Sequence, residues 1–277
     1  MMMGSGVFAG KFSLETALSA RDAGGTSVAQ ELRAIGYAGD DPVGGRPVGA
    51  YFEAHIEQGP ILEHESKTVG VVTGSLGVRW YDVTITGMEM HAGPTPMAIR
   101  KDALYAASFL VQAVVELARA NAPHGRGTVG EIHAHPGSRN VIPGQVRMTV
   151  DLRHQDEATL ANMDRQWLAR AAQVAREHAV EIDVRQVQYF PPTPFDPELV
   201  GWIREAAQQR DLPAMDIVTG AGHDAVYMAS VTPTAMIFVP CKDGISHNEI
   251  EDAKPADLEA GANVLLDAML ARANTQP

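Results

Sequence analysis

Apolar and polar residues alternate most regularly in the middle of the chain, where they predict strands over residues 78–87 and 145–154. The first strand has one apolar face, formed by Tyr81, Val83 and Ile85. The second strand also has an apolar face, formed by Val146, Met148, Val150 and Leu152. Two more strands are predicted over residues 128–134 and 181–190, and the Pro-Gly turn of "VIPGQ" leads into the strand at 145.

Helical spacing predicts two helices between these strands. The first covers residues 99–121, with a stripe formed by Leu104, Ser108, Val111, Val115 and Ala118. The second covers residues 156–179, with a stripe formed by Leu160, Met163, Trp167, Ala171 and Val174. The resulting order is strand–helix–strand–strand–helix–strand, which is typical of the split βαβ or ferredoxin-like arrangement.

The flanking regions have a different pattern, in which short apolar strands alternate with helices. The strands are predicted over 48–56, 68–75, 215–219 and 234–239, and the helices over 197–211, 223–230 and 254–273. Alternation of this kind favours an α/β sheet domain. We therefore predict an α/β domain made of residues 1–76 and 191–277, with an α+β ferredoxin-like domain (βαββαβ) inserted over residues 77–190.

Composition narrows the class of protein. The chain has 277 residues, 45% of them hydrophobic and 20% charged, as in soluble globular proteins. Its formal net charge of -12 would repel nucleic acid, and its apolar stretches are shorter than the roughly 20 residues of a membrane span. A single cysteine, Cys241, excludes an internal disulfide and fits a reducing cytoplasm. We expect a cytoplasmic protein that acts on small molecules and binds neither nucleic acid nor membrane.

Polar residues that could carry chemistry gather in four segments, three of which lie at predicted strand ends. These segments are "HIEQ" with His55 and Gln58, "GMEMHAGPTPM" with His91, "GSRNVIPG" with Asn140 and the nearby Arg153, and the pair "TGAGHDA" and "DGISHNE" with Gly222, His223, Asp224 and His247. The joint occurrence of these segments favours a functional site more than any one of them does alone.

Each segment also has a purely structural interpretation. A single histidine at a strand end is more often a hydrogen-bonding residue than a metal ligand. Asp224 follows a glycine loop at the start of a predicted helix, so an N-terminal cap is its expected role. His154 and Asp156 have His-x-Asp spacing, but they lie at a strand-to-helix junction and are not expected to bind metal. Glu57 has no role that the sequence indicates.

Taken together, four long motifs resemble one family. "HIEQGPILE", "RWYDVTITGMEMHAGPTPMAIRKDAL", "GSRNVIPGQVRMTVDLR" and "GAGHDAVYMA…PTAMIFVPCKDGISHNEIE" are similar to motifs of the amidase, hydantoinase/carbamoylase family. That family includes N-carbamoyl-L-amino-acid amidohydrolases, β-ureidopropionases and allantoate amidohydrolases, within the dinuclear metallopeptidase clan. The resemblance covers nearly the whole chain.

The resemblance implies a set of residue roles. It implies that His55 and His247 each bind one of two divalent metal ions, Zn²⁺ or Mn²⁺, with Co²⁺ or Ni²⁺ also compatible with imidazole. It implies that His91, delivered from the partner subunit of a homodimer, stabilises the oxyanion of the tetrahedral intermediate. It also implies that the substrate is bound by Gln58, Asn140, Arg153, Gly222 and His223, with Arg153 on the α-carboxylate.

The resemblance further implies that the inserted domain is a lid and dimerisation domain and that the catalytic domain is incomplete. The family's N-terminal segment carries a His-x-Asp motif, a bridging aspartate and a Glu-Glu pair, and these 277 residues contain no Glu-Glu pair. The expected activity is hydrolysis of N-carbamoyl-L-amino acids. The alternatives are N-carbamoyl-β-alanine or allantoate as substrate, a peptidase or aminoacylase of the same clan, and a non-catalytic chain that dimerises or binds small carboxylates.

Overall fold

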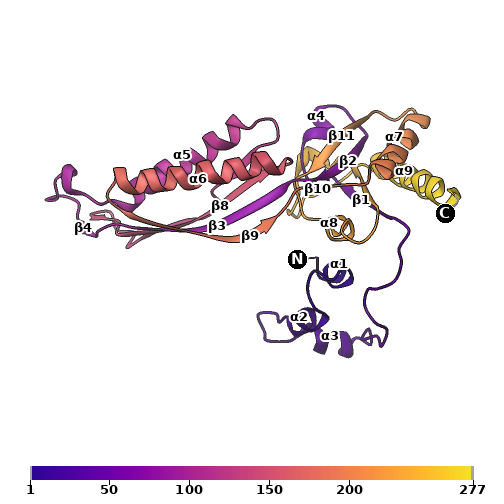
Figure 1. Cartoon of the computed structure of the whole chain (residues 1–277), viewed down its shortest axis with the longest axis horizontal. Coiled ribbons are helices and arrows are strands. Elements are labelled where there is room, and N and C mark those ends of the chain that lie inside the picture. Colours follow the sequence, from indigo (N-terminus) through magenta and orange to yellow (C-terminus); the bar gives the residue numbers. More distant parts are fainter. Residues whose placement is uncertain (1, 276–277) are drawn as a thin grey trace. The chain divides into compact units, whose positions relative to one another are not determined.

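The chain enters one folded unit, leaves it for a second and then returns to the first (Figure 1). The computed structural model describes residues 2–275. Unit 1 combines Met1–Ser75 with Pro194–Pro277, and unit 2 spans Leu76–Thr193. Each unit has its own hydrophobic core and its own sheet. The prediction of a mixed α/β protein is thereby confirmed.

Unit 2 is built on an antiparallel sheet. In chain order its main elements are β3 (Gly77–Thr86), α5 (Ala103–Ala120), β5 (Arg126–Thr128), β6 (Ile132–His135), β8 (Gln145–His154), α6 (Glu157–Glu177) and β9 (Glu181–Phe190). Strand β3 lies between β8 and β9, and the short strands β5 and β6 pair with the other edge of β8. A separate pair, β4 (Met90–His91) and β7 (Val141–Ile142), flanks the 3-10 turn at Met97–Ile99.

The two helices of unit 2 lie on the same face of this sheet (Figure 1). The predicted stripe of α6 is confirmed, because all five of its residues are buried against the sheet. The predicted apolar faces of β3 and β8 are buried in the same core. Asp156 accepts a hydrogen bond from the Thr159 amide at 2.7 Å and caps α6, so the His-x-Asp pair at 154–156 belongs to a helix cap.

The predicted buried face of α5 is wrong for Leu104 and Ser108, which are exposed, but Ala118 is buried as predicted. Leu104 is 41% exposed, whereas the residues buried in the core are Ala103, Ala106, Ala107, Leu110, Val114, Leu117 and Ala118. The physical reason is close packing, since a Cβ placed on Gly127 of β5 would lie only 2.5 Å from the Val114 carbonyl oxygen. Alanines permit this approach better than the larger residues that define the sequence pattern.

By length and composition α5 could also cross a membrane, with a mean hydropathy of 1.3 over 18 residues. A core helix of a globular protein has the same composition, and the apolar face of α5 is packed in the unit 2 core. The strand predicted over 128–134 is also corrected, because two short strands, β5 and β6, occupy this region.

Unit 1 contains a mixed sheet of β1 (Tyr51–Ile56), β2 (Val69–Ser75), β10 (Thr193–Pro194), β11 (Ala214–Thr219) and β12 (Thr234–Val239). Its helices are α1 (Met3–Phe8), α2 (Leu14–Ser19), α3 (Val28–Ala34), α4 (Ile61–His64), α7 (Pro197–Gln209), α8 (Asp224–Met228) and α9 (Pro255–Asn274), with a 3-10 turn at Lys242–Gly244. Strands β1 and β12 are parallel neighbours. Their carboxyl ends therefore meet at one sheet edge, the usual place for a ligand site in α/β proteins.

Candidate functional site

The carboxyl end of β1 carries His55 and Gln58 to this sheet edge. His55 Nδ1 lies 2.9 Å from the Ile56 carbonyl oxygen. Because a carbonyl oxygen can only accept, Nδ1 carries the hydrogen and Nε2 keeps its lone pair. Gln58 follows with a positive φ of 57°, and its amide nitrogen donates to Ser246 Oγ at 3.0 Å. This contact joins the end of β1 to the loop that carries His247.

The His247 loop is held by Glu251. Ser246 Oγ donates to Glu251 Oε2 at 2.6 Å, and the His247 amide donates to the same oxygen at 3.1 Å. These two hydrogen bonds lower the pKa of Glu251. His247 also has a φ of 57°, a conformation that costs energy for a residue other than glycine. The sequence indicated His247 but not Ser246 or Glu251, the residues that order its backbone.

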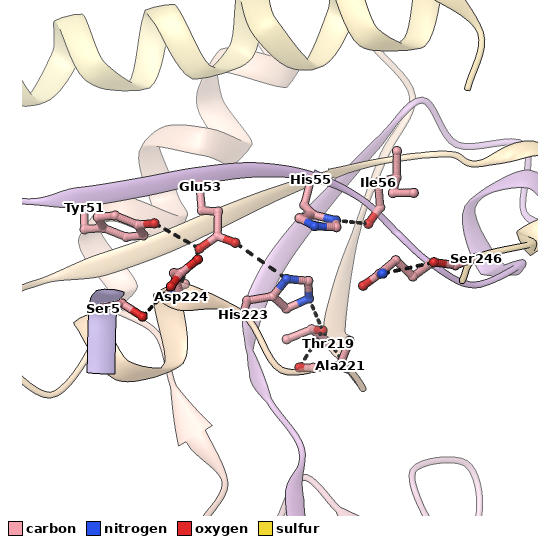
Figure 2. A network of polar contacts seen from close by, with 12 residues as sticks. Ser5, Tyr51, Glu53, His55, Ile56, Thr219, Ala221, His223, Asp224 and Ser246 are labelled. Carbon is pink, nitrogen blue, oxygen red and sulfur yellow. Dashed lines mark hydrogen bonds and ion pairs between the residues drawn. The ribbon is translucent and has the colours of Figure 1, made fainter. Parts of the chain in front are cut away.

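Glu53 is the centre of a second polar network, which Figure 2 shows. Its carboxylate accepts hydrogen bonds from the Ala225 amide at 2.7 Å and the Tyr51 hydroxyl at 3.2 Å. His223 Nδ1 lies 3.6 Å from Glu53 Oε1, which is longer than a hydrogen bond. Burial alone would raise the pKa of Glu53, but the three contacts together lower it. Sequence reasoning missed Glu53, although it alternates with Tyr51 and His55 on β1.

His223 is buried between this network and His55. It is 3% exposed, and its Nε2 lies 2.9 Å from Thr219 Oγ1. Its ring packs edge-on against the His55 ring, with 4.7 Å between centroids (Figure 2). The structure therefore brings together three of the predicted site residues, His55, Gln58 and His223. Gly222, in the same loop, is close enough to Met2 that a Cβ there would lie 3.5 Å from the methionine Cε.

The prediction that Asp224 caps α8 is wrong. Its carboxylate instead accepts a hydrogen bond from Ser5 Oγ, which links α8 to α1 (Figure 2). The first free amide of α8, that of Ala225, is capped by Glu53 from strand β1. The capping residue is remote in sequence, so no local pattern could reveal it. Glu57 also acts as a helix cap, because its carboxylate accepts from the Ile61 and Leu62 amides of α4, both at 2.8 Å.

The fit of these residues to a metal ion is incomplete. The His55 tautomer suits a ligand, because Nε2 has a lone pair and the other ring nitrogen is held by a carbonyl. Across residues 2–275, however, no group of three or more His, Cys, Asp or Glu side chains is placed to hold a metal ion. The described residues therefore do not form a complete metal site.

Unit 2 brings His91 and Asn140 together. Strands β4 and β7 pair His91 with Val141, and the Ala92 amide donates to the Asn140 carbonyl at 2.8 Å. His91 Nδ1 accepts from the Gly93 amide at 3.1 Å. In neutral His91 the hydrogen is therefore on Nε2, which leaves an N–H donor on an exposed side chain.

Arg153 lies on β8 and is paired with Asp151 on the same face of the strand. Arg153 Nε lies 2.9 Å from Asp151 Oδ1, and Nη2 lies 2.5 Å from Oδ2. Both side chains are 25% exposed. The guanidinium is therefore partly ordered by a carboxylate of its own chain.

Arg153 and His91 lie at opposite ends of the unit 2 sheet. Arg153 pairs with Val78 at the start of β3, whereas Gln145 pairs with Thr86 at its end. The β4–β7 pair follows from the Gln145 end, where the Gly87 amide donates to the Gly144 carbonyl. Eight residues of strand separate the two ends, or about 26 Å at ~3.3 Å per residue. Within one chain the structure does not bring Arg153 to His91 and Asn140.

Comparison with known proteins gives a consistent family. Residues 15–271 match the profile of peptidase family M20/M25/M40. The chain is 45% identical over 269 residues to an N-carbamoyl-L-amino-acid amidohydrolase from Rhizobium meliloti, covering 97% of this chain and 65% of that protein. It is 36% identical over 246 residues to an allantoate amidohydrolase from Escherichia coli (strain K12), covering 88% of this chain and 60% of that protein.

A solved structure agrees with these relatives. The crystal structure of an amidase of the hydantoinase/carbamoylase family from Burkholderia multivorans has a TM-score of 0.96 and 56% identity, covering 100% of this chain and 67% of that one. The chain thus spans between 60% and 67% of the length of these three relatives. On the profile match and this structural agreement, the chain belongs to peptidase family M20/M25/M40 and, within it, to the amidases of the hydantoinase/carbamoylase family.

Proposed function

We propose that this chain belongs to an amidohydrolase that cleaves the ureido C–N bond of N-carbamoyl-L-amino acids. One water molecule is consumed, and ammonia, carbon dioxide and the free amino acid are released. The observation that carries the proposal is the direct link between Gln58 and the His247 loop at the carboxyl ends of β1 and β12. The 45% identity to an amidohydrolase of this specificity supports the choice of substrate.

Arg153 and His91 have complementary roles in this proposal. A planar guanidinium can bind the substrate α-carboxylate through two parallel hydrogen bonds, so Arg153 holds the carboxylate end. The Nε2–H of His91 donates to the oxygen that becomes negatively charged when water attacks the ureido carbonyl. Gln58 and Asn140 offer amide groups to the polar ends of the substrate, and Gly222 and His223 are further substrate-binding residues in this proposal.

The separation of Arg153 from His91 supports a homodimer. An N-carbamoyl amino acid is far shorter than the roughly 26 Å between the two ends of β8, estimated from the strand rise. One chain therefore cannot place both side chains on the same substrate molecule. We propose that His91 and Asn140 act in the partner subunit's site, with unit 2 as a ferredoxin-like lid and dimerisation domain.

Members of this family generally use divalent metal ions. We propose His55 and His247 as ligands of such ions, Zn²⁺ or Mn²⁺, because imidazole nitrogen suits both. The residues 2–275 that the structure describes do not complete such a metal site. A cytoplasmic location remains our proposal on the single cysteine of the chain.

Allantoate is the strongest alternative substrate, since two relatives at 36% and 32% identity are named allantoate amidohydrolases. Allantoate and N-carbamoyl-β-alanine also present a ureido group and a carboxylate, so Arg153 and Gln58 could bind either. The deciding assay measures ammonia release from N-carbamoyl-L-methionine, its D-enantiomer, N-carbamoyl-β-alanine and allantoate, with protein dialysed against Zn²⁺ or Mn²⁺. Preference for the L-methionine derivative supports the proposal. Preference for allantoate, or binding without ammonia release, contradicts it.

A further inference from the structure

The face of the unit 2 sheet opposite the helices contains a hollow of about 290 Å³. Its lining comes from four strands and the turn after β5, and includes Trp80, Asp82, Asp151 and Val187. The side chains that point into it alternate with residues buried under the helices, such as Tyr81 and Val83 of β3.

A β-bulge forms one wall of this hollow. The register between β3 and β9 shifts at Trp80, which pairs with Gln188, while Tyr81 pairs with Gln186. Val187 is the extra residue, and it is directed into the hollow beside Trp80. Bulges redirect side chains in this way and are common next to binding sites. Trp80 is 43% exposed and Val187 is 44% exposed, so two apolar side chains remain open to a ligand.

The acidic residues at the rim are already balanced by arginines. Asp82 Oδ2 lies 2.6 Å from Arg185 Nη2, and Asp151 Oδ2 lies 2.5 Å from Arg153 Nη2. The hollow therefore carries little unbalanced charge, and its exposed walls are the indole of Trp80 and the side chain of Val187. Asp151 both lines the hollow and contacts Arg153, which places the hollow one side chain away from the proposed carboxylate-binding residue.

We infer that this hollow receives the side chain of the amino-acid moiety, with Trp80 and Val187 selecting apolar and aromatic substrates whose carboxylate is bound by Arg153. The inference rests on the proposed function for the identity of the substrate. The carboxylate and the side chain of an α-amino acid are bonded to the same carbon, which matches the neighbouring positions of the Arg153 guanidinium and the apolar wall of the hollow. The aromatic wall offers stacking to an aromatic substrate and contact area to an aliphatic one.

Trp80→Ala and Val187→Ala test the inference, with Thr84→Ala as control because Thr84 lies on the same face of β3 outside the hollow. For N-carbamoyl-L-phenylalanine we expect KM to rise about tenfold or more in Trp80→Ala, the range typical of lost apolar contacts. For N-carbamoylglycine, which has no side chain, we expect a change of less than about twofold on the same principle. Equal effects on both substrates would overturn the inference.

A binding measurement keeps the test independent of turnover. Of the three tryptophans, Trp80 is 43% exposed, Trp167 is 1% exposed and Trp202 is partly buried in unit 1, so the Trp80→Ala variant isolates the part of the acrylamide quenching that comes from Trp80. N-carbamoyl-L-phenylalanine should protect the wild type from quenching, N-carbamoylglycine should not, and Trp80→Ala should lose the difference. Protection without ammonia release would support the hollow and contradict only the proposed activity. Unchanged quenching, or a Trp80→Ala variant that changes oligomer mass instead of substrate preference, would overturn the inference.

Discussion

Replacement of Glu53 tests the polar network that joins β1 to α8. The Glu53 carboxylate accepts from the Ala225 amide and the Tyr51 hydroxyl, and its Oε1 lies 3.6 Å from His223 Nδ1 (Figure 2). Glu53→Ala removes all three contacts and leaves two donors without their acceptor. Glu53→Gln keeps a carbonyl oxygen for the Ala225 amide but removes the negative charge.

The size of each effect follows from these contacts. A hydrogen bond to a charged group contributes about 1.5–3 kcal/mol, and the Glu53 side chain is only 14% exposed, so water replaces it poorly. Glu53→Ala should therefore lower the free energy of unfolding by about 3–6 kcal/mol, as two such bonds are lost. Glu53→Gln should lower it by about 1–2 kcal/mol, because one neutral acceptor remains.

Two measurements check this expectation. Urea unfolding gives the change in free energy, and hydrogen exchange of the Ala225 amide reports directly on the lost cap. Glu205→Ala, an exposed residue of α7, is the matched control. The reasoning is refuted if Glu53→Ala is no less stable than the control, or if the Ala225 amide exchanges as slowly as in the wild type.

The network also predicts a pH dependence. The folded-state pKa of Glu53 is lowered from its ordinary value of 4.5, so the unfolded chain binds this proton more tightly than the folded protein. The resulting stability is present above pH 4.5 and is lost as the pH falls through the folded-state pKa, with a slope of up to about 1.4 kcal/mol per pH unit. Glu53→Gln should remove this part of the acid dependence. If the stability of Glu53→Gln falls with pH as steeply as that of the wild type, Glu53 is not the source of this acid dependence.

Two further predictions concern other buried polar groups. Tyr81 donates to Asp164 at 2.6 Å, so Tyr81→Phe should cost about 1.5–3 kcal/mol of stability in urea unfolding. Burial, and then Asp164, raise the pKa of Tyr81, so its contribution to the free energy of unfolding is complete below pH 10 and falls at higher pH. If the wild type loses stability above pH 10 and Tyr81→Phe loses just as much, this role of Tyr81 is contradicted. Glu57→Ala should cost about 1–3 kcal/mol and speed exchange of the Ile61 and Leu62 amides, which lose their acceptor; unchanged exchange would show that Glu57 is not the cap.

The elements that the sequence predicted well are those in which large apolar residues repeat along one face. Strand β8 alternates large apolar residues with polar ones, and the bounds predicted for it, 145–154, are those observed. The stripe of α6 is equally clear because all of its members are buried. The face of α5 failed because its buried side includes small alanines, and hydrophobic spacing gives more weight to an exposed residue such as Leu104.

The candidate site shows where local sequence stops being informative. His55 and His247 stand in recognisable motifs, but the polar residues around them do not. Glu53 caps a helix that begins 171 residues later, at Asp224, and this contact depends on which segments the fold brings together. Glu251 binds the His247 backbone within a turn of four residues, but no sequence pattern indicated this turn. The separation of Arg153 from His91 likewise follows from strand pairing and is not visible as a motif.

The measurement that tests the central claim most directly is calorimetric titration of N-carbamoyl-L-methionine into the wild type and Arg153→Lys. Lysine keeps the positive charge but lacks the planar guanidinium that donates two parallel hydrogen bonds. We therefore predict that the affinity of Arg153→Lys for N-carbamoyl-L-methionine falls about tenfold, or ~1.4 kcal/mol. The neutral amide of the same compound should bind the wild type more weakly than the carboxylate does. Equal affinities in wild type and variant, or equal binding of amide and carboxylate, would contradict recognition of a ureido carboxylate by Arg153.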